Sequence, residues 1–198
     1  AQLYQYDALR QAYLYWNQKV NLISRKDTDQ IEIHHILHSL SLLKEIRFIG
    51  HSRILDIGTG GGLPAIPLAI ALPDVSFTAI DGTGKKVKIA NEIAKSLKLA
   101  NIQCIHSRAE DHSGKYDFAI SRAVTTIDKL VDMSRKFINP THRNIIPNGI
   151  IAYKGGNPKQ EITLLPRKSP YEVFDIYERI PIDYFIENQL SVVNKLGI

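Results

Sequence analysis

Hydrophobic residues in the first part of the chain recur at intervals of three and four positions. The repeat is formed by Tyr6, Leu9, Tyr13 and Trp16. This spacing is typical of a helix with one apolar face, and we expect that face to pack on the core rather than to stack bases. The acidic and hydroxyl residues at 27–29 can cap a second helix, which we predict over residues 30–44.

From residue 53 onward, short apolar runs alternate with segments of helical periodicity. The runs predict strands at 53–57, 75–80, 102–105, 118–121 and 149–153. Helices are expected from a glycine-rich turn to residue 71, and at 85–99 and 128–137. Strands that alternate with helices indicate a parallel sheet that is covered on both faces.

The C-terminal part departs from this rhythm. Two β-rich runs at 171–180 and 190–196 leave no room for a helix between them, so we expect an antiparallel hairpin at the sheet edge. We therefore predict one α/β domain over 1–198. Residues 1–50 form an N-terminal helical cap, and 51–198 form a Rossmann-like core with a seven-stranded, mostly parallel sheet. A reversed final strand favours methyltransferases over dehydrogenases, which usually continue to a sixth parallel strand.

A glycine-rich loop follows the first predicted strand. Glycine allows a tight turn and close approach of a ligand to the backbone, and the loop contains Gly58, Gly60, Gly61 and Gly62. Asp81 ends the next strand, where its carboxylate suits the ribose hydroxyls of either NAD or S-adenosylmethionine. Asp56 would repel a pyrophosphate but suits a ligand with an ammonium group and a sulfonium. Its alternative role is to hold the amides of the loop.

Two further positions fit ligand binding at the same edge of the sheet. Ala109 and Glu110 follow the third strand, where this kind of fold approaches an adenine ring. Arg122 follows the fourth strand at the carboxyl edge, where open α/β sheets bind ligands. An ion pair with a loop carboxylate is the alternative role for Arg122.

The charge balance adds an anionic partner to this picture. The chain has 25 Lys and Arg against 20 Asp and Glu, a formal net charge of +5. This favours nucleic acid, although a mildly basic enzyme with a small substrate is also compatible. The basic residues gather mostly at connections, where they could contact phosphates around the mouth of the site. These residues are Arg25, Lys26, Lys85, Lys86, Lys88, Arg143, Lys154, Lys159, Arg167 and Lys168.

Cysteine and histidine exclude some other chemistries. The single cysteine, Cys104, excludes an internal disulfide and a multi-cysteine zinc site, and its apolar surroundings predict a core position. His34 and His38 are four residues apart on a predicted helix, but without an obvious third ligand we expect no metal. We expect a solvated or RNA-facing surface there. No apolar run is long enough for a membrane helix, and without a signal-peptide layout we expect a cytoplasmic protein.

The most specific string in the chain is DIGTGGGLPAIPLA at 56–69. Further strings lie at 21–24, at 35–37 with Ser39, at Asp81 with 84–86, and at 107–110, 121–124 and 154–155. On these strings the sequence resembles the GidB/RsmG family, bacterial methyltransferases of guanine N7 in small-subunit ribosomal RNA. The residues at His34, His38, Ala65 and Gly82 depart from the family, which usually has Arg, Asp, Gly and Ser there.

The resemblance implies a class I methyltransferase fold, S-adenosylmethionine as the cofactor, and 16S ribosomal RNA as the substrate. The RNA could be recognised alone, in the small ribosomal subunit or in an assembly intermediate, and we expect a monomer without membrane or metal partners. Arg122 and Lys154 would face the reaction centre and the RNA as catalytic residues. The cofactor-binding residues would be Gly58, Gly60, Leu63, Asp81, Ala109, Glu110 and Arg122.

Methylation at guanine N7 makes modest demands on the protein. The attacking lone pair is already present on a neutral ring, so no general base is needed. Proximity and orientation can supply at most ~7–11 kcal/mol of the barrier reduction.

Three alternatives remain open. A small-molecule methyltransferase predicts an apolar lid and little salt dependence. An NAD-dependent oxidoreductase is disfavoured by Asp56 and the terminal hairpin. The third is a catalytically silent, methyltransferase-like RNA-binding protein, which only a measurement of turnover would distinguish from an active enzyme.

Overall fold

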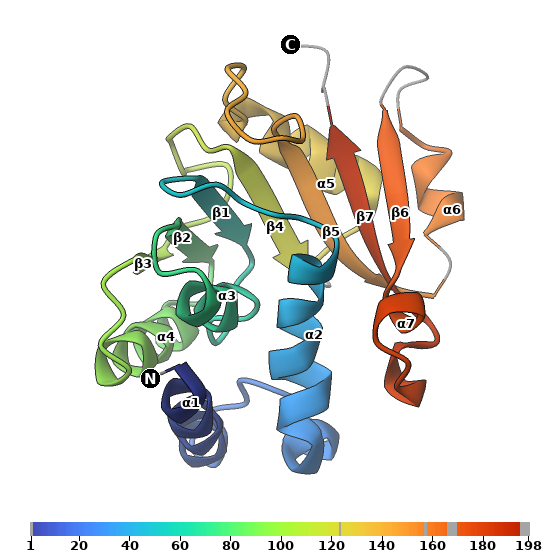
Figure 1. Cartoon of the computed structure of the whole chain (residues 1–198). Helices are drawn as coiled ribbons and strands as arrows, with labels where there is room; N and C mark the ends of the chain where they lie inside the picture. Colours follow the sequence, from blue (N-terminus) through green and yellow to red (C-terminus); the bar gives the residue numbers. More distant parts are fainter. Residues whose placement is uncertain (1, 123, 157, 166–169, 195–198) are drawn as a thin grey trace.

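The computed structural model describes residues 2–122, 124–156, 158–165 and 170–194. A seven-stranded sheet with the order β3-β2-β1-β4-β5-β7-β6 forms its centre (Figure 1). The strands are β1 (Arg53–Ile57), β2 (Ser76–Asp81), β3 (Ile102–His106), β4 (Phe118–Arg122), β5 (Gly149–Gly155), β6 (Tyr171–Asp175) and β7 (Asn188–Asn194). Strands β1 to β5 are parallel, and β7 is antiparallel to both β5 and β6. The predicted fold class is confirmed.

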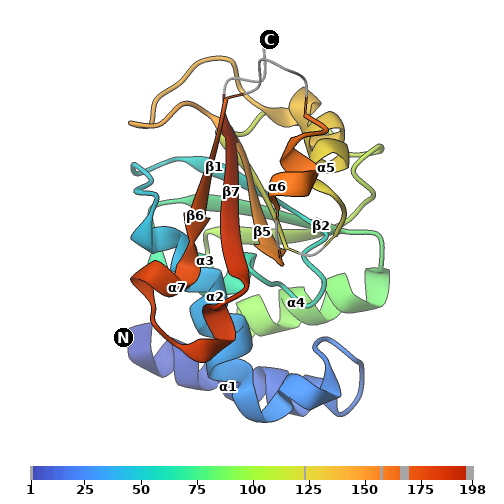
Figure 2. The same cartoon turned by 90° about the vertical axis from the view of Figure 1, so that its right-hand side faces the viewer.

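Helices cover both faces of the sheet. The α-helices are α1 (Gln2–Asn17), α2 (His38–Leu40), α3 (Ala65–Ala71), α4 (Gly84–Ser96), α5 (Ile127–Ser134), α6 (Lys159–Ile162) and α7 (Ile176–Arg179). One core cluster joins residues of α1, α3 and α4 to one face of the sheet, and a second joins residues of α5 and α6 to the other. Figure 2 shows α5 and α6 together on one side of the strands.

Side chains along the central strands alternate between these two cores. On β4, Phe118 and Ile120 enter the core with α3 and α4, whereas Ala119 enters the core with α5. On β5, Ile151 and Tyr153 belong to the same core cluster as Phe118 and Ile120. The alternation follows from the two-residue period of a strand. It also explains why the predicted strands are almost continuously apolar.

The N-terminal helices pack at the carboxyl ends of the strands. Leu9, Tyr13 and Ile31 are fully buried and belong to the same core cluster as Ile54 of β1, so the predicted apolar face of α1 packs as expected. Figure 1 shows α1 and the helical column labelled α2 at the end of the molecule toward which the arrows of β1 and β4 point.

The predicted second helix is helical throughout, but it is not one α-helix. Two 3-10 segments, Arg25–Gln30 and Ser41–Lys44, flank a π-helical segment at Glu32–Leu37 and the single turn of α2. Hydroxyl groups contribute to this change, because Ser39 and Ser41 donate hydrogen bonds to the preceding carbonyls of His35 and His38. Such bonds compete with regular helix geometry.

The C-terminal hairpin pairs as predicted, with Tyr171 opposite Val193 and Asp175 opposite Gln189. The expectation of a strand over 171–180 and no helix in the connection was wrong. The strand ends at Asp175, whose carboxylate accepts a hydrogen bond from the Tyr177 amide and thereby caps α7. A 3-10 turn at Asp183–Phe185 follows, and it buries Phe185. Residues 195–196 of the second predicted run lie outside the described residues.

Helices of membrane-spanning length and apolarity are absent from the described residues.

Candidate functional site

A pocket of about 250 Å³ lies at the carboxyl ends of β1, β2 and β3. It contains four residues that the sequence predicts for the cofactor: Gly58, Asp81, Ala109 and Glu110. We call it the glycine-loop pocket. The remaining lining residues are Ile57, Ile80, Gly82, Ser107, Arg108, Val124 and Met133. Parallel strands end together at this edge, so residues from distant parts of the sequence meet there.

The glycine loop is shaped by backbone conformations that favour glycine. Gly58, Gly60 and Gly62 have φ values of +74°, +56° and +101°. A Cβ atom at Gly58 would come within 2.4 Å of Cγ2 of Val124, whereas a Cβ atom at Gly60 would meet nothing within 4 Å. Gly58 is therefore required by both conformation and space, and Gly60 by conformation alone.

Asp81 fixes this loop to the end of β2. One carboxylate oxygen accepts a hydrogen bond from the Gly60 amide at 2.9 Å, and the other accepts one from the Thr83 amide at 2.7 Å. Each oxygen keeps a further lone pair for a ligand hydroxyl. Asp81 thus joins Gly60 to the pocket, although Gly60 and Leu63 are not among the lining residues. Leu63 is 5% exposed and packs in the core below the loop.

Asp56 lies beneath the loop and does not line the pocket. Its side chain is fully buried, and Oδ2 accepts a hydrogen bond from the Ala65 amide at 3.2 Å. Burial raises the pKa of Asp56 to about 7. The geometry is that of a residue that holds the start of α3, which is the alternative role given to Asp56 by the sequence.

A second pocket, of about 290 Å³, lies between the N-terminal helices and the ends of β4, β5 and β7. We call it the cap pocket. It is lined by His34, His35, His38, Arg122, Tyr153, Lys154, Gly155, Tyr184 and Asn188. Only one residue separates Arg122, which lines the cap pocket, from Val124, which lines the glycine-loop pocket. The structure thus places Arg122 beside the predicted cofactor residues but not among them.

The guanidinium of Arg122 points toward the N-terminal helices. Its Nη1 lies 3.5 Å from the carbonyl oxygen of His34, and its Nη2 lies 3.1 Å from Nδ1 of His35. Burial lowers the pKa of the Arg122 guanidinium. The alternative of an ion pair between Arg122 and a loop carboxylate has no support in the described part of the chain.

His38 does not lie on the solvated or RNA-facing surface expected from the sequence, whereas His34 is partly buried and lines the cap pocket. His38 is 6% exposed, and its ring packs edge-on against Tyr153, Tyr184 and Phe185. Burial lowers the pKa of His38 to about 3. The His34 ring stacks on Tyr184, with 3.9 Å between ring centroids. The described residues contain no cluster of three or more His, Cys, Asp or Glu side chains suited to a metal.

Lys154 pairs with a neighbouring helix. Its ammonium lies 2.9 Å from Oε2 of Glu161 in α6 and donates a hydrogen bond to the Thr125 carbonyl at 3.0 Å. The same Glu161 oxygen accepts a hydrogen bond from the Ile127 amide at the start of α5. Lys154 therefore holds the segment that follows Arg122, in addition to lining the cap pocket.

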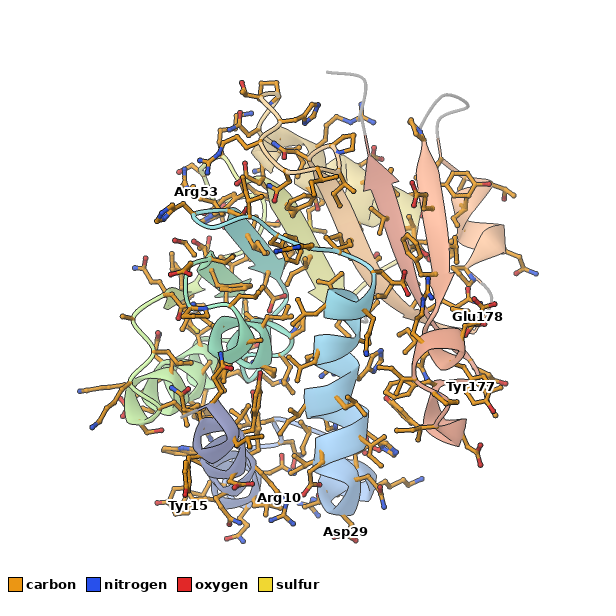
Figure 3. All side chains as sticks on the ribbon, viewed as in Figure 1. Arg10, Tyr15, Asp29, Arg53, Tyr177 and Glu178 are labelled. Carbon is orange, nitrogen blue, oxygen red and sulfur yellow. The ribbon has the colours of Figure 1, made fainter. Side chains whose placement is uncertain are left out.

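The other residues singled out in the sequence lie apart from the two pockets. Cys104 is buried in β3, as predicted. Figure 3 labels Arg10 and Asp29 at the cap end of the molecule and Arg53 at the opposite end. Arg25, Lys26, Lys85, Lys88 and Arg143 are exposed. Arg167 and Lys168, and the side chain of Lys159, lie outside the described residues.

Several residues of the cap pocket region have contacts that their sequence pattern does not predict. Asp27 contacts His34 and His35, and Tyr184 contacts both His34 and His38. Asp27 is read from the sequence only as a helix cap, and Tyr184 falls in a connection for which no structure is predicted. No local spacing could reveal the contacts of Tyr184, because 150 positions separate it from His34.

Comparisons of the sequence with known proteins add to this structural description. The family model GidB, described as rRNA small subunit methyltransferase G, matches residues 2–175. A protein of Phocaeicola vulgatus named "Ribosomal RNA small subunit methyltransferase G" is 42% identical over 98% of this chain and 92% of its own. A Bacteroides fragilis protein of the same name is 42% identical over 91% of this chain and 87% of its own.

Solved structures share the fold at low identity. Precorrin-6y C5,15-methyltransferase of Geobacter metallireducens is 11% identical, covers 89% of this chain and 93% of its own, and has a TM-score of 0.59. TrmN of Thermus thermophilus is 17% identical, covers 80% of this chain and 47% of its own, and has a TM-score of 0.57. At these identities the likeness concerns the fold.

Proposed function

The chain belongs to the GidB family, rRNA small subunit methyltransferase G, and from this membership we propose that it transfers a methyl group from S-adenosylmethionine to N7 of a guanine in 16S ribosomal RNA. The observation that carries the proposal is the glycine-loop pocket of a chain in this family. That pocket contains Gly58, where an added Cβ atom would crowd Val124, and the carboxylate of Asp81 at the end of β2.

The residues of the glycine-loop pocket fit S-adenosylmethionine. Asp81 offers free lone pairs to the ribose hydroxyls, and the backbone at Gly58 leaves the ligand close access. Ala109 and Glu110 would lie beside the adenine, together with the apolar side chains of the pocket. Those side chains are Ile80, Val124 and Met133. When bound, the cofactor supplies an electrophilic methyl group on a sulfonium.

The cap pocket supports the acceptor side of the reaction. It adjoins the glycine-loop pocket through the segment after β4, and it combines aromatic rings with the positive charge of Arg122. An unstacked base can pack against such rings, and RNA is commonly recognised in this way. In this proposal Arg122 is the catalytic residue that faces the RNA. Lys154 is a positioning residue, because Glu161 already holds its ammonium.

Orientation is the main contribution of the protein in this proposal. Guanine N7 needs no proton removed, so no residue of the cap pocket has to act as a base. Half-buried His35 and buried His38 agree with that, because burial lowers the pKa of His35 to about 4 and that of His38 to about 3. Both are neutral near pH 7, when they can accept or donate hydrogen bonds without adding positive charge beside the methylated base.

The same proposal includes the organisation and setting of the protein. Residues 1–50 act as a cap on a single domain that spans 1–198, since α1 and residue Ile31 share a core with β1. We place the protein in the cytoplasm as a monomer that acts on 16S ribosomal RNA in the small subunit or in free form. The net charge of +5 supports an RNA partner.

Transfer of a labelled methyl group tests the proposal directly. The protein is incubated with labelled S-adenosylmethionine and small-subunit ribosomal RNA, or intact subunits, from a strain that lacks the protein. The expected result is label in 16S ribosomal RNA as base-labile N7-methylguanine. Label in neither RNA nor subunits, with the cofactor still bound by calorimetry, would overturn the RNA substrate. It would favour a small-molecule acceptor or a silent binding protein.

A further inference from the structure

Arg122 carries a partly buried positive charge whose nearest polar partners are neutral. No Asp or Glu side chain forms an ion pair with it in the described ranges. The guanidinium contacts the carbonyl oxygen of His34 and Nδ1 of His35, at 3.5 and 3.1 Å. A long side chain held this way depends on those two contacts for its orientation.

The contact with Arg122 defines the tautomer of His35. A guanidinium has only donors, so Nδ1 of His35 must accept the hydrogen bond and the ring proton must lie on Nε2. That Nε2 is buried and lies 3.7 Å from Oδ2 of Asp27. The Asp27 carboxylate therefore faces the protonated side of the ring, and it favours the tautomer that accepts from Arg122.

Asp27 is itself held by the N-terminal helices. Its second oxygen, Oδ1, lies 2.9 Å from Nδ1 of His34, which donates to it. The His34 ring stacks on Tyr184, and the Tyr184 hydroxyl donates a hydrogen bond to the His34 carbonyl at 3.2 Å. The orientation of Asp27 is thus fixed by packing that extends from the cap to the connection before β7.

We propose that Asp27 and His35 are positioning residues that hold the guanidinium of Arg122 in the cap pocket for methyl transfer. The inference rests on the proposed function, in which Arg122 faces the RNA. Asp27 sets the His35 tautomer, and His35 sets the direction of the guanidinium. The cap thereby contributes to the reaction through Arg122 rather than through a group of its own. Misplacing a catalytic group by 1 Å can lower the rate about 100-fold.

Two variants of His35 separate positioning from packing. In His35→Asn the amide oxygen stands where Nδ1 stood, so the acceptor for Arg122 remains. In His35→Gln the polar atoms stand near Nε2, so the acceptor is lost. We expect His35→Asn to retain kcat within about threefold of the native value, and His35→Gln to lower kcat about 10- to 100-fold. Neither should change the KM for S-adenosylmethionine by more than about threefold.

Asp27→Asn tests the next link. It keeps an acceptor for His34 but removes the negative charge that faces His35, and we expect kcat to fall about three- to tenfold. Glu32→Gln is the matched control, since Glu32 lies on the same run of helices and pairs with Arg10 at an exposed position. Its kcat should stay within about twofold of the native value. Equal kcat for His35→Asn and His35→Gln would overturn the proposal.

A spectroscopic measurement separates this proposal from the proposed function. Nitrogen-15 NMR of the arginine side chains detects guanidinium groups whose rotation is restricted, and Arg122→Lys identifies the Arg122 signals by their loss. We expect restricted rotation in the native protein and in His35→Asn, and averaged signals in His35→Gln. This pattern in a protein that fails to methylate RNA would disprove the function and keep the positioning. Averaged signals in the native protein would overturn the positioning.

Discussion

The two pockets are built in different ways, although they share the segment that follows β4. The glycine-loop pocket is formed by turns after β1, β2 and β3, and its shape depends on backbone amides that bond to Asp81. The cap pocket is formed by side chains from the N-terminal helices, from β4 and β5, and from the connection before β7. Backbone thus determines the first pocket, and tertiary packing of side chains determines the second.

This difference predicts different consequences of mutation. A substitution in the glycine loop changes the space or the backbone that a cofactor meets, so its main effect should be on cofactor affinity. A substitution in the cap pocket changes the orientation of polar side chains, so its main effect should be on the rate of transfer. Variants that violate this division would show that the two pockets act as one site.

Gly58→Ala should have the largest effect. The added Cβ would lie 2.4 Å from Cγ2 of Val124, at a residue whose φ is +74°. Both the backbone strain and the crowding oppose the native loop. We expect affinity for S-adenosylmethionine to fall at least about 100-fold, measured by calorimetry.

Two companion variants separate strain from crowding. Gly60→Ala introduces similar backbone strain at φ +56° but meets no atom within 4 Å, so its loss of affinity should be smaller. Combining Gly58→Ala with Val124→Ala removes the crowding atom and should restore part of the affinity. If Gly60→Ala and Gly58→Ala were equally impaired, space at Gly58 would not be the determining factor.

Asp81→Asn should have the second largest effect. Both carboxylate oxygens accept backbone hydrogen bonds, from Gly60 and Thr83, and an amide would turn one acceptor into a donor facing an N–H group. We expect cofactor affinity to fall about 10- to 100-fold. Asp117→Asn is the matched control, because buried Asp117 also accepts a backbone hydrogen bond, from Arg53. It should lower stability without changing affinity, and a loss of affinity equal to that of Asp81→Asn would contradict the role of Asp81.

The same difference explains what the sequence could predict. Gly58, Asp81, Ala109 and Glu110 could be placed in one pocket because each follows a strand, and parallel strands end at one edge. His35 could not be connected with Arg122, since 87 positions separate them and no strand rule joins a cap to a sheet. For the same reason the burial of His38 was predicted wrongly. Its surroundings come from β5 and from the turn at Asp183–Phe185.

Boundaries of elements show a similar limit. The strands of the parallel core were predicted to within a few residues, because apolar runs and turns are local signals. The change to π-helical geometry at Glu32–Leu37 was not predicted. Helical periodicity describes the apolar face of a segment, but it does not distinguish one helix type from another.

A change of pH should have the third largest effect. Its contribution to the free energy of unfolding should have one sign for the histidines of the cap pocket and the opposite sign for Asp56 beneath the glycine loop. Burial lowers the pKa of His35 to about 4 and of His38 to about 3. The stability that these two histidines contribute is present above the ordinary histidine pKa. It is lost as the pH falls below that value toward the pKa of the folded protein, because the unfolded chain then binds more protons than the folded chain. Burial raises the pKa of Asp56 to about 7. Its contribution has the opposite sign, because the folded chain binds more protons between the two carboxyl pKa values.

Asp56→Asn isolates these opposing contributions. The native protein should lose stability on acidification from pH 7.5 to pH 5, with Asp56 offsetting part of the loss. In Asp56→Asn this offset is absent, so the loss should increase by about 2 kcal/mol, measured by urea unfolding at the two pH values. An unchanged loss would mean that Asp56 is ionised in the folded protein and that burial does not control its pKa.

Tyr13→Phe should have the smallest effect, and it tests how separate the two regions are. Tyr13 is a cap residue, but its buried hydroxyl donates a hydrogen bond at 3.1 Å to the carbonyl of Gly61 in the glycine loop. Removing the hydroxyl leaves the ring in place and deprives that carbonyl of its donor. We expect a loss of stability of about 1 kcal/mol and a rise of about two- to tenfold in the Kd of S-adenosylmethionine.

Tyr6→Phe provides the comparison that gives this result its meaning. Tyr6 lies on the same helix and donates a hydrogen bond at 3.0 Å to the carbonyl of Pro67, which belongs to α3 rather than to the loop. Its loss should lower stability without changing the Kd. A rise in Kd for Tyr13→Phe alone would mean that the cap supports the glycine loop as well as Arg122. A native Kd for both variants would mean that the glycine loop holds its shape without the Tyr13 hydroxyl, and that the cap serves only the cap pocket.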